Sequence, residues 1–275
     1  MLTRILAPIL CALLAVASAC DAPALNAASS WYEIVAAEPD PAVVTDAEAR
    51  ARMTATKLPW KVRDLMTGIV MLLCPPGEFM MGSPASEAGR EDDEAQHRVQ
   101  ITKAFYLSET EVTQESWQKV VGANPSEFQL ANNPVEQVSW NDCQNFCQSS
   151  GLRLASESEW EYACRAGTTG AYAGDLASMA WFSDNSGGST QLVKQRKPNA
   201  WGLYDMHGNV WEWCQDVYAQ SASSTQQASA GNDGARVLRG GGWFHGASNC
   251  RSARRDGTAP GYSFGLGFRV ARTSE

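Results

Sequence analysis

The residues whose types and spacing could form a functional site lie in one stretch, residues 199–213, which reads NAWGLYDMHGNVWEW. It combines three tryptophans with glycines and with the carboxylates of Asp205 and Glu212. Glycine lets the backbone pass close to another group, and an indole covers that group. The stretch therefore predicts a compact, irregular core. Similar composition returns in RVLRGGGWF from residue 236 and in GFRVAR at 267–272.

The chain lacks the residue patterns of several common catalytic sites. The only histidines are His97, His207 and His245, and no CxxC pair occurs, so we expect no zinc cluster. No glycine-rich phosphate loop and no Ser-His-Asp order is present. His207 is expected to fill the 199–213 loop rather than to act as an acid–base catalyst. The sequence assigns no catalytic residue.

Composition narrows the class of protein. The chain has 275 residues, of which 44% are hydrophobic, and a net charge of −8. This length suits one large globular domain or a domain with a tail. An acidic chain is a poor partner for a phosphate backbone, so we expect no nucleic acid.

The N-terminus predicts export. Residues 1–19 combine Arg4, an apolar run at 5–17 and a small-residue cleavage site, which together are typical of a signal peptide. Cys20 follows directly and is the expected lipid-attachment site, which predicts a membrane-anchored lipoprotein, periplasmic or at the cell surface. The alternative is simple secretion after cleavage at Ala19. Residues 20–59 are expected to form a flexible tether with a short helix around 47–56.

Alternation and capping residues locate the first elements of the domain. A strand is expected near residues 60–64, then a hairpin-like pair of strands around a Pro-Pro-Gly turn, and another strand within 99–113. Residues 84–98 are expected to be a solvated, charged loop. Thr113, Ser139 and Ser156 predict the starts of three helices, which end near Val121, Gly151 and Gly167. Chain beyond residue 168 has little periodicity.

Cysteine usage fits an exported protein. Outside the leader and Cys20, six cysteines remain, which in this setting predict disulfides: Cys74, Cys143, Cys147, Cys164, Cys214 and Cys250. Six cysteines allow fifteen connectivities. Cys214 and Cys250 both flank the tryptophan-glycine core, so a bond between them is the leading expectation.

Seven motifs follow one another in a specific order: PPGEFMMGS, SETEVTQESW, PVEQVSWNDC, RLASESEWEYACRAG, NAWGLYDMHGNVWEW, VLRGGGW and GFRVAR. This order resembles the formylglycine-generating enzyme family, also called sulfatase-modifying factor domains, over about residues 66–272. The resemblance implies an α+β, C-type-lectin-like single domain at 60–275. Such a domain has short helices, a small twisted antiparallel sheet and much irregular chain.

The sequence departs from the family at its catalytic thiols. The enzymes bind copper(I) through two cysteines near the C-terminus, since soft thiolates select that ion. Here only Cys250 follows the turn at 240–243, and Gly242 replaces the usual serine. His245 and Cys250 alone would make a weak metal site. Copper-dependent formylglycine formation is therefore not expected.

Two branches of the family survive this loss. One comprises oxidative enzymes that resemble pyoverdine-maturation proteins, and the other comprises exported binding proteins, including variable proteins diversified by retroelements. We expect the second: binding of a protein or small-molecule ligand by the C-terminal loops, with an oxidoreductase as the alternative. Aromatic and charged side chains on loops suit recognition. The expected ligand-binding residues are Trp243, Phe244, His245, Arg254, Asp256, Tyr262 and Phe264.

The resemblance also implies a structural calcium site at Asp205, Gly208, Val210 and Glu212. Calcium takes hard oxygen ligands, which carboxylates and backbone carbonyls supply. The alternative is that Asp205 caps a turn and Glu212 pairs with an arginine. Three arginines in framework motifs are expected to pair with buried carboxylates: Arg239, Arg251 and Arg269. Three glutamates of the third helix are expected on its surface or in its cap: Glu157, Glu159 and Glu161.

Overall fold

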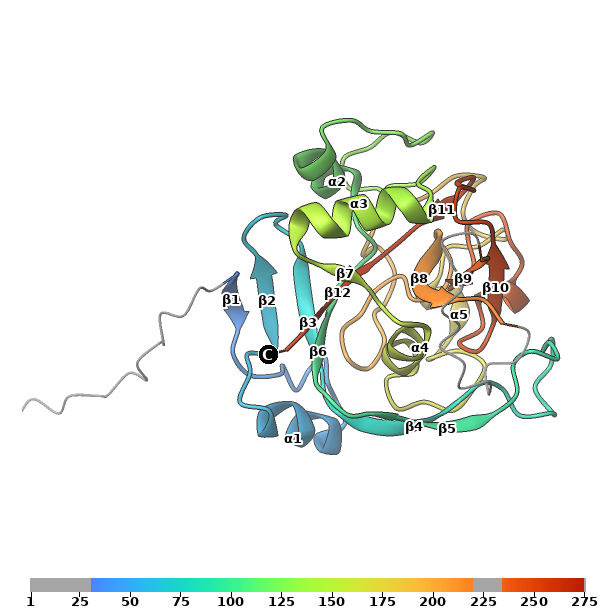
Figure 1. Ribbon diagram of the computed structural model, residues 1–275. Helices are drawn as coiled ribbons and strands as arrows, with labels where there is room; N and C mark the ends of the chain where they lie inside the picture. The colour runs from blue at the N-terminus through green and yellow to red at the C-terminus, as the bar shows by residue number, and fades with distance from the viewer. Residues whose placement is uncertain (1–30, 220–233, 275) are drawn as a thin grey trace, which may run out of the picture. The chain divides into compact units, whose positions relative to one another are not determined.

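The computed structural model describes residues 31–219 and 234–274. The expected signal peptide and Cys20 lie outside these residues. The described chain forms three sheets of six, four and two strands with short helices between them (Figure 1). The expected α+β architecture is confirmed. Among the described residues, no helix is long and apolar enough to cross a membrane.

The six-stranded sheet joins segments from both ends of the described chain. Its order is β1-β2-β3-β6-β12-β7, and every neighbouring pair is antiparallel. The strands are β1 (Tyr32–Ala36), β2 (Lys61–Asp64), β3 (Val70–Cys74), β6 (Phe105–Ser108), β7 (Arg153–Leu154) and β12 (Val270–Thr273). The last strand of the chain thus lies between β6 and β7.

The segment before residue 60 belongs to the domain, so the expected tether is wrong from residue 31 onward. Strand β1 pairs with β2, and α1 (Ala47–Ala55) begins at an Asp46 cap and buries Ala49 and Met53. Val44 is also fully buried. These contacts remove apolar surface from water, which a freely moving tether would not do. The short helix expected around 47–56 is confirmed.

The Pro-Pro-Gly turn passes the chain from one sheet to another. Strand β4 (Gly77–Met81) pairs with β5 (His97–Ile101), whereas β3 pairs with β2 and β6. The expected hairpin of the two flanking strands is therefore wrong. The segment expected as one strand within 99–113 divides into β5 and β6.

The three expected helices are confirmed with their caps. Helix α2 (Gln114–Val121) starts at Thr113, and α3 (Trp140–Ser150) starts at a Ser139–Asp142 capping box. Helix α4 (Glu157–Arg165) starts at a Ser156–Glu159 capping box. In a capping box each side chain satisfies a backbone amide that the first turn leaves unpaired. Shorter helices form later, α5 (Leu176–Met179) and the 3-10 turn η1 (Ala247–Cys250).

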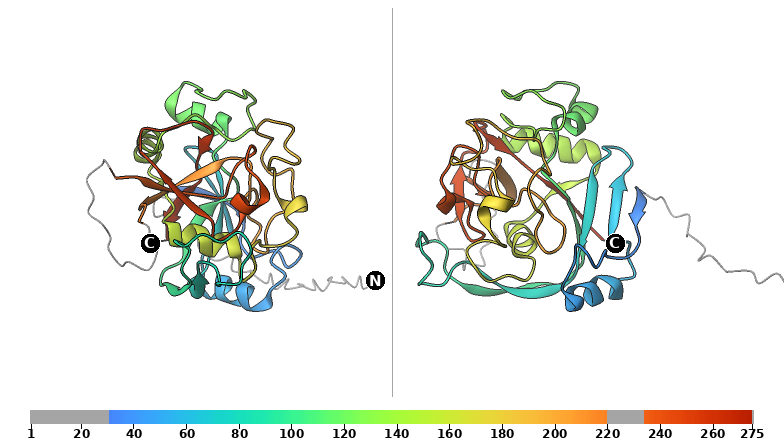
Figure 2. Two further views of the ribbon diagram at one scale, coloured as in Figure 1. Left: turned by 90° about the vertical axis from the view of Figure 1, so that its right-hand side faces the viewer. Right: turned by 180° about the vertical axis from the view of Figure 1, so that it is seen from behind.

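The four-stranded sheet carries the C-terminal loops. Its order is β10-β9-β8-β11, with β8 (Trp211–Val217), β9 (Arg236–Arg239), β10 (Arg255–Thr258) and β11 (Leu266–Gly267). Strand β11 runs parallel to β8, and the other pairs are antiparallel. Helix α4 contacts β8 and β9 of this sheet and also β4. Figure 2 shows the arrangement of the helices and strands from two further sides. Helix α4 therefore packs against the four-stranded sheet.

Candidate functional site

The tryptophans of the 199–213 stretch form the expected compact core. Trp201 and Trp213 are buried together with Trp160 of α4. The Trp213 indole N–H donates to the carbonyl of Val138 at 2.9 Å, and the Trp160 N–H donates to Glu212 at 2.7 Å. The polar edge of an indole needs such a partner when it is buried.

The core also contains buried ion pairs, as expected for the three framework arginines. Arg269 donates through Nε and Nη2 to both carboxylate oxygens of Glu212, each at 2.7 Å. Arg239 pairs with Glu161. Arg251 pairs with two carboxylates of the 84–98 segment, Glu87 at 2.7 Å and Glu94 at 2.6 Å.

These pairs correct two expectations. Glu157 and Glu161 are buried, and they bind Arg255 and Arg239 instead of lying on the helix surface. Only Glu159 has the expected capping role. The 84–98 segment is not fully solvated either, because Glu94 is 0% exposed in its pair with Arg251.

Two buried carboxylates beside this core lack complete partners. Oε1 of Glu111 and Oδ1 of Asp205 make no hydrogen bond to any described residue. Burial, followed by the nearby charge of Asp205, raises the pKa of Glu111 well above its usual range. Burial also raises the pKa of Asp205 to about 6. Unpaired buried carboxylate oxygens are costly unless a cation or a proton satisfies them.

The remaining expected calcium ligands differ in how close they lie to these two carboxylates and in whether they already have a partner. Gly208 and Val210 flank Asn209, whose side-chain amide donates to Glu111 at 3.4 Å. Glu212 is committed to Arg269, as its alternative interpretation stated. Within residues 31–219 and 234–274, no three His, Cys, Asp or Glu side chains are arranged to hold a metal. A calcium site here would need backbone carbonyls as well as carboxylates.

His207 and Cys164 lie together but do not form a reactive pair. The sulfur of Cys164 lies 3.8 Å from Nε2 of His207. Nδ1 of His207 lies 2.7 Å from the carbonyl of Cys250, and Nε2 accepts from the Ala173 amide, so both nitrogens are occupied. Burial raises the pKa of Cys164 to about 12 and lowers the pKa of His207 to about 4. Both groups are therefore neutral near pH 7, as a loop-filling role for His207 requires.

The expected Cys214–Cys250 disulfide is absent. All six cysteines in the described chain are free and buried. Cys214 belongs to the main hydrophobic core, whereas Cys250 packs with Ala180 and Phe182 in a separate cluster. Flanking the same motif in sequence did not bring the two sulfurs together. The thiols act here as small apolar side chains.

A cavity of about 370 Å³, which we call the aromatic pocket, opens over one face of the four-stranded sheet. Its floor contains Trp211 of β8, Leu238 of β9, Asp256 of β10 and Leu266 of β11. Asp256 is directly opposite Leu238, and Leu266 is directly opposite Trp211. Residues opposite one another in a sheet share a face.

Two loops form the walls of the aromatic pocket. Phe244 and His245 follow β9, and Tyr262 and Phe264 precede β11. The loops meet where the Phe244 ring packs on Gly265, whose φ is +67° and where a Cβ would lie 2.7 Å from the ring. Glycine is required there both for the backbone conformation and for the close approach.

The tautomer of His245 follows from its partner. The Trp211 indole N–H donates to Nδ1 of His245 at 3.0 Å, and an indole is only a donor. The ring hydrogen of neutral His245 is therefore on Nε2. Burial lowers the pKa of His245. The aromatic pocket thus has an uncharged imidazole as one wall near neutral pH.

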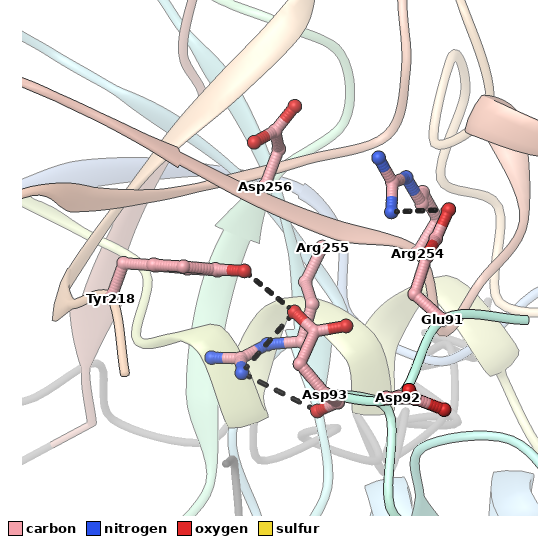
Figure 3. A pocket seen from close by; sticks show the side chains of 7 residues that line it. All are labelled: Glu91, Asp92, Asp93, Tyr218, Arg254, Arg255 and Asp256. Carbon is pink, nitrogen blue, oxygen red and sulfur yellow. Dashed lines mark hydrogen bonds and ion pairs between the residues drawn. The ribbon is translucent and has the colours of Figure 1, made fainter. Parts of the chain in front are cut away.

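Five of the seven expected ligand-binding residues line the aromatic pocket, and two do not. Trp243 packs edge to face on Phe128, with ring centroids 5.3 Å apart. Arg254 lies 3.4 Å from Glu91 and lines a neighbouring polar pocket of about 450 Å³, which shares Asp256 with the aromatic pocket (Figure 3).

Several residues of the candidate sites were not expected from the sequence. Trp211, Leu238 and Leu266 of the floor were missed because sheet register is not visible in the sequence of one strand. Glu111 was also missed, although it lies in the SETEVTQESW motif. Nothing in the local sequence shows that Glu111 lies near Asp205, which follows 94 positions later in the chain.

Comparisons with known proteins agree with this architecture. A formylglycine-generating enzyme of Streptomyces coelicolor is 34% identical over 190 residues, which are 58% of this chain and 59% of the relative. The chaperone protein LppX of Paenibacillus barcinonensis is 28% identical over 200 residues, with 50% and 69% covered. The chain thus spans about three-fifths of the length of the first relative.

Two solved structures match over more of their length. PvdO from Pseudomonas aeruginosa is 29% identical with a TM-score of 0.71, and 78% of this chain and 98% of that chain are covered. Treponema denticola variable protein 1 is 30% identical with a TM-score of 0.66, with 75% and 95% covered. The expected C-type-lectin-like fold is thereby confirmed. A model of the sulfatase-modifying factor enzyme 1-like domain matches residues 62–274, and the chain belongs to that family.

Proposed function

We propose that this protein binds a ligand in the aromatic pocket, without copper chemistry. The observation that carries the proposal is the composition of the pocket: aromatic walls, one exposed carboxylate and no cysteine among its lining residues. Tyr262 and Phe264 each leave 48% of their surface exposed. Aromatic side chains grouped around a cavity are the usual anchors of a binding site.

The thiol that remains near the family's catalytic position is poorly suited to bind copper(I). Cys250 is 0% exposed, and burial raises its pKa to about 12. A metal ligand must be a thiolate, and burial in apolar surroundings opposes its formation. Binding by relatives also supports the proposal, since LppX is named a chaperone.

Ligand-observed NMR with a library of small organic fragments tests the proposal. We expect bound fragments whose signals are lost in the Tyr262→Ser/Phe264→Ser double variant. The matched control is Met66→Ser/Leu130→Ser, which removes two similarly exposed apolar side chains that do not line the pocket. If fragments do not bind, or bind equally to both double variants, the pocket is not the ligand site.

We further propose that the protein holds a structural calcium ion beside the core. The unpartnered oxygens of Glu111 and Asp205 support this, and the carbonyls of Gly208 and Val210 are the expected additional ligands. A bound cation would neutralise two buried carboxylates that otherwise repel each other. Glu212 would remain with Arg269.

We also propose export and lipid attachment at Cys20. The support is the order of Arg4, the apolar run at 5–17 and the small residues before Cys20. A lipid there would hold the domain at a membrane surface, where it would bind its ligand.

A further inference from the structure

Two phenylalanine rings of the aromatic pocket stand at a steep angle to each other. Phe244 and Phe264 have centroids 5.8 Å apart with their planes at 63°. Trp211 and Tyr262 line the same cavity. Rings arranged as a corner present more than one π face or edge to a single guest, unlike a parallel stack that closes on itself.

Some aromatic rings elsewhere in the described chain lie beneath a cation. Six rings have a lysine or arginine over them, such as Trp140 with Arg236 at 4.0 Å and Tyr218 with Arg255 at 5.0 Å. None of these six pairs involves Trp211, Phe244, Tyr262 or Phe264. The pocket rings therefore have no cation from residues 31–219 or 234–274.

A carboxylate borders these rings without a cationic partner. Asp256 is exposed, and among the described residues it accepts a hydrogen bond only from the Gly257 amide, at 2.7 Å, and forms no ion pair. In Figure 3 it stands apart from Arg254 and Arg255, whose partners are Glu91 and Asp93.

The groups around Asp256 preserve a negative potential. The adjoining polar pocket is lined by Glu91, Asp92 and Asp93 together with Arg254 and Arg255, so that with Asp256 its carboxylates outnumber its guanidinium groups by four to two. The imidazole of His245 is uncharged near neutral pH and does not oppose a cation. A guest that fits this setting combines a positive charge with apolar surface.

We propose that the aromatic pocket recognises an organic cation, an alkylated ammonium group held over the Phe244 and Phe264 rings and beside Asp256. This inference rests on the proposed binding function and adds the chemical class of the ligand. Binding involves no covalent step. A cation–π contact and a nearby carboxylate act together, because the rings replace water around the charge while Asp256 balances it.

Isothermal titration calorimetry with two probes of matched shape tests the charge requirement. Choline carries the positive charge, and 3,3-dimethylbutan-1-ol has the same shape without it. We expect choline to bind about tenfold more tightly than the neutral alcohol. Raising the salt concentration should weaken choline binding and leave the alcohol unchanged, since only the charge is screened.

Two variants separate the contributions of the carboxylate and the ring. Asp256→Asn should weaken choline binding by about fivefold, and Phe264→Leu, which keeps apolar volume, should weaken it by a similar factor. The control is Glu48→Gln on α1, which removes one exposed negative charge and lines neither the aromatic pocket nor the polar pocket. Its affinity for choline should equal that of the wild type.

The outcomes distinguish the two levels of the proposal. Equal affinity for both probes, or an unchanged affinity in Asp256→Asn, overturns the organic-cation inference, while fragment binding lost in Tyr262→Ser/Phe264→Ser would still support the binding function. If neither probe nor any fragment binds the pocket, both fail. A normal thermal transition for each variant verifies that it is folded.

Discussion

At the scale of single residues, two carboxylates determine how the protein should respond to pH and calcium. In Glu111 and Asp205, burial raises the pKa. The folded state therefore holds their protons more tightly than the unfolded state. The contribution of these two carboxyl groups to the stability of the fold is present at low pH. It is lost as the pH rises through their folded-state pKa, which is about 6 for Asp205. Calcium binds the ionised forms and should compensate for that loss.

We therefore expect chelation to lower the melting temperature much more at pH 8 than at pH 5. Calcium at 100 times its dissociation constant would add about 2.7 kcal/mol. The Glu111→Gln/Asp205→Asn double variant should lose this sensitivity, whereas Glu115→Gln on α2 should retain it. Differential scanning calorimetry with calcium or chelator at both pH values makes the comparison. An equal effect of calcium on the wild type and the double variant would contradict the site.

His207 changes the stability of the fold with pH in the opposite direction to Glu111 and Asp205. Burial lowers its folded-state pKa from 6.5 to about 4, so the unfolded chain binds a proton more readily. Its contribution to stability is present above pH 6.5 and is lost as the pH falls towards 4. The comparison with and without calcium must be made at each pH, because the His207 effect then cancels.

At the scale of elements, the ion pairs join the C-terminal strands to the core. Arg269 immediately precedes β12 and holds Glu212 of β8, while its other donors reach the carbonyls of Ser108 and Tyr204. Both side chains of the pair are 1% exposed. The pair therefore links the six-stranded and four-stranded sheets in a region without competing water.

Glu212→Gln should destabilise the fold by about 3–5 kcal/mol, because it leaves the Arg269 charge buried without its counterion. The free energy of unfolding from urea titration measures the effect. The control is Glu115→Gln, whose pair with Lys119 spans 3.9 Å on the surface. It should change stability by less than about 0.5 kcal/mol. Similar values for the two variants would show that Arg269 finds another partner.

Local signals and distant contacts differ in how well the sequence predicts them. The caps at Thr113, Ser139 and Ser156 could be predicted, because each accepts from an amide only three positions away. The arginines could be predicted to pair, yet not with which acid, since Arg251 meets Glu94 across 157 positions. Five residues that line the aromatic pocket were among those expected to bind ligand, because they lie between family motifs in chain expected to form loops and are aromatic or charged or, for His245, carry an imidazole. The floor of the pocket depends on strand register, which the sequence does not show.

At the scale of the whole molecule, the family motifs predict the domain but not its N-terminal limit. The described domain begins at Trp31, and β1 and α1 are integral to it. Family motifs begin only near residue 66, and the acidic, alanine-rich composition before them conceals the strand and helix. Disulfides were predicted only because six cysteines occur in a chain that is expected to be exported. In the structure these cysteines are free.

Cys20→Ala should release the protein from membranes while leaving its domain folded, if Cys20 carries the lipid. Expression in a lipoprotein-exporting bacterium, labelling with radioactive palmitate and membrane sedimentation measure this. Cys11→Ala is the matched control, because it lies inside the expected signal peptide. It should remain labelled and sediment with membranes. Continued labelling of Cys20→Ala would contradict the proposed attachment site.

The position of β12 has a consequence for how the chain reaches its native state. Residues 270–273 form an interior strand between β6 and β7, so β7 stays separate from the rest of the large sheet until these residues arrive. Closing it requires Ala271 to meet Leu107, a contact distant in sequence that makes folding slow. Synthesis alone therefore cannot complete this sheet progressively. A chain stopped a few residues early would carry two open strand edges, each able to recruit another molecule.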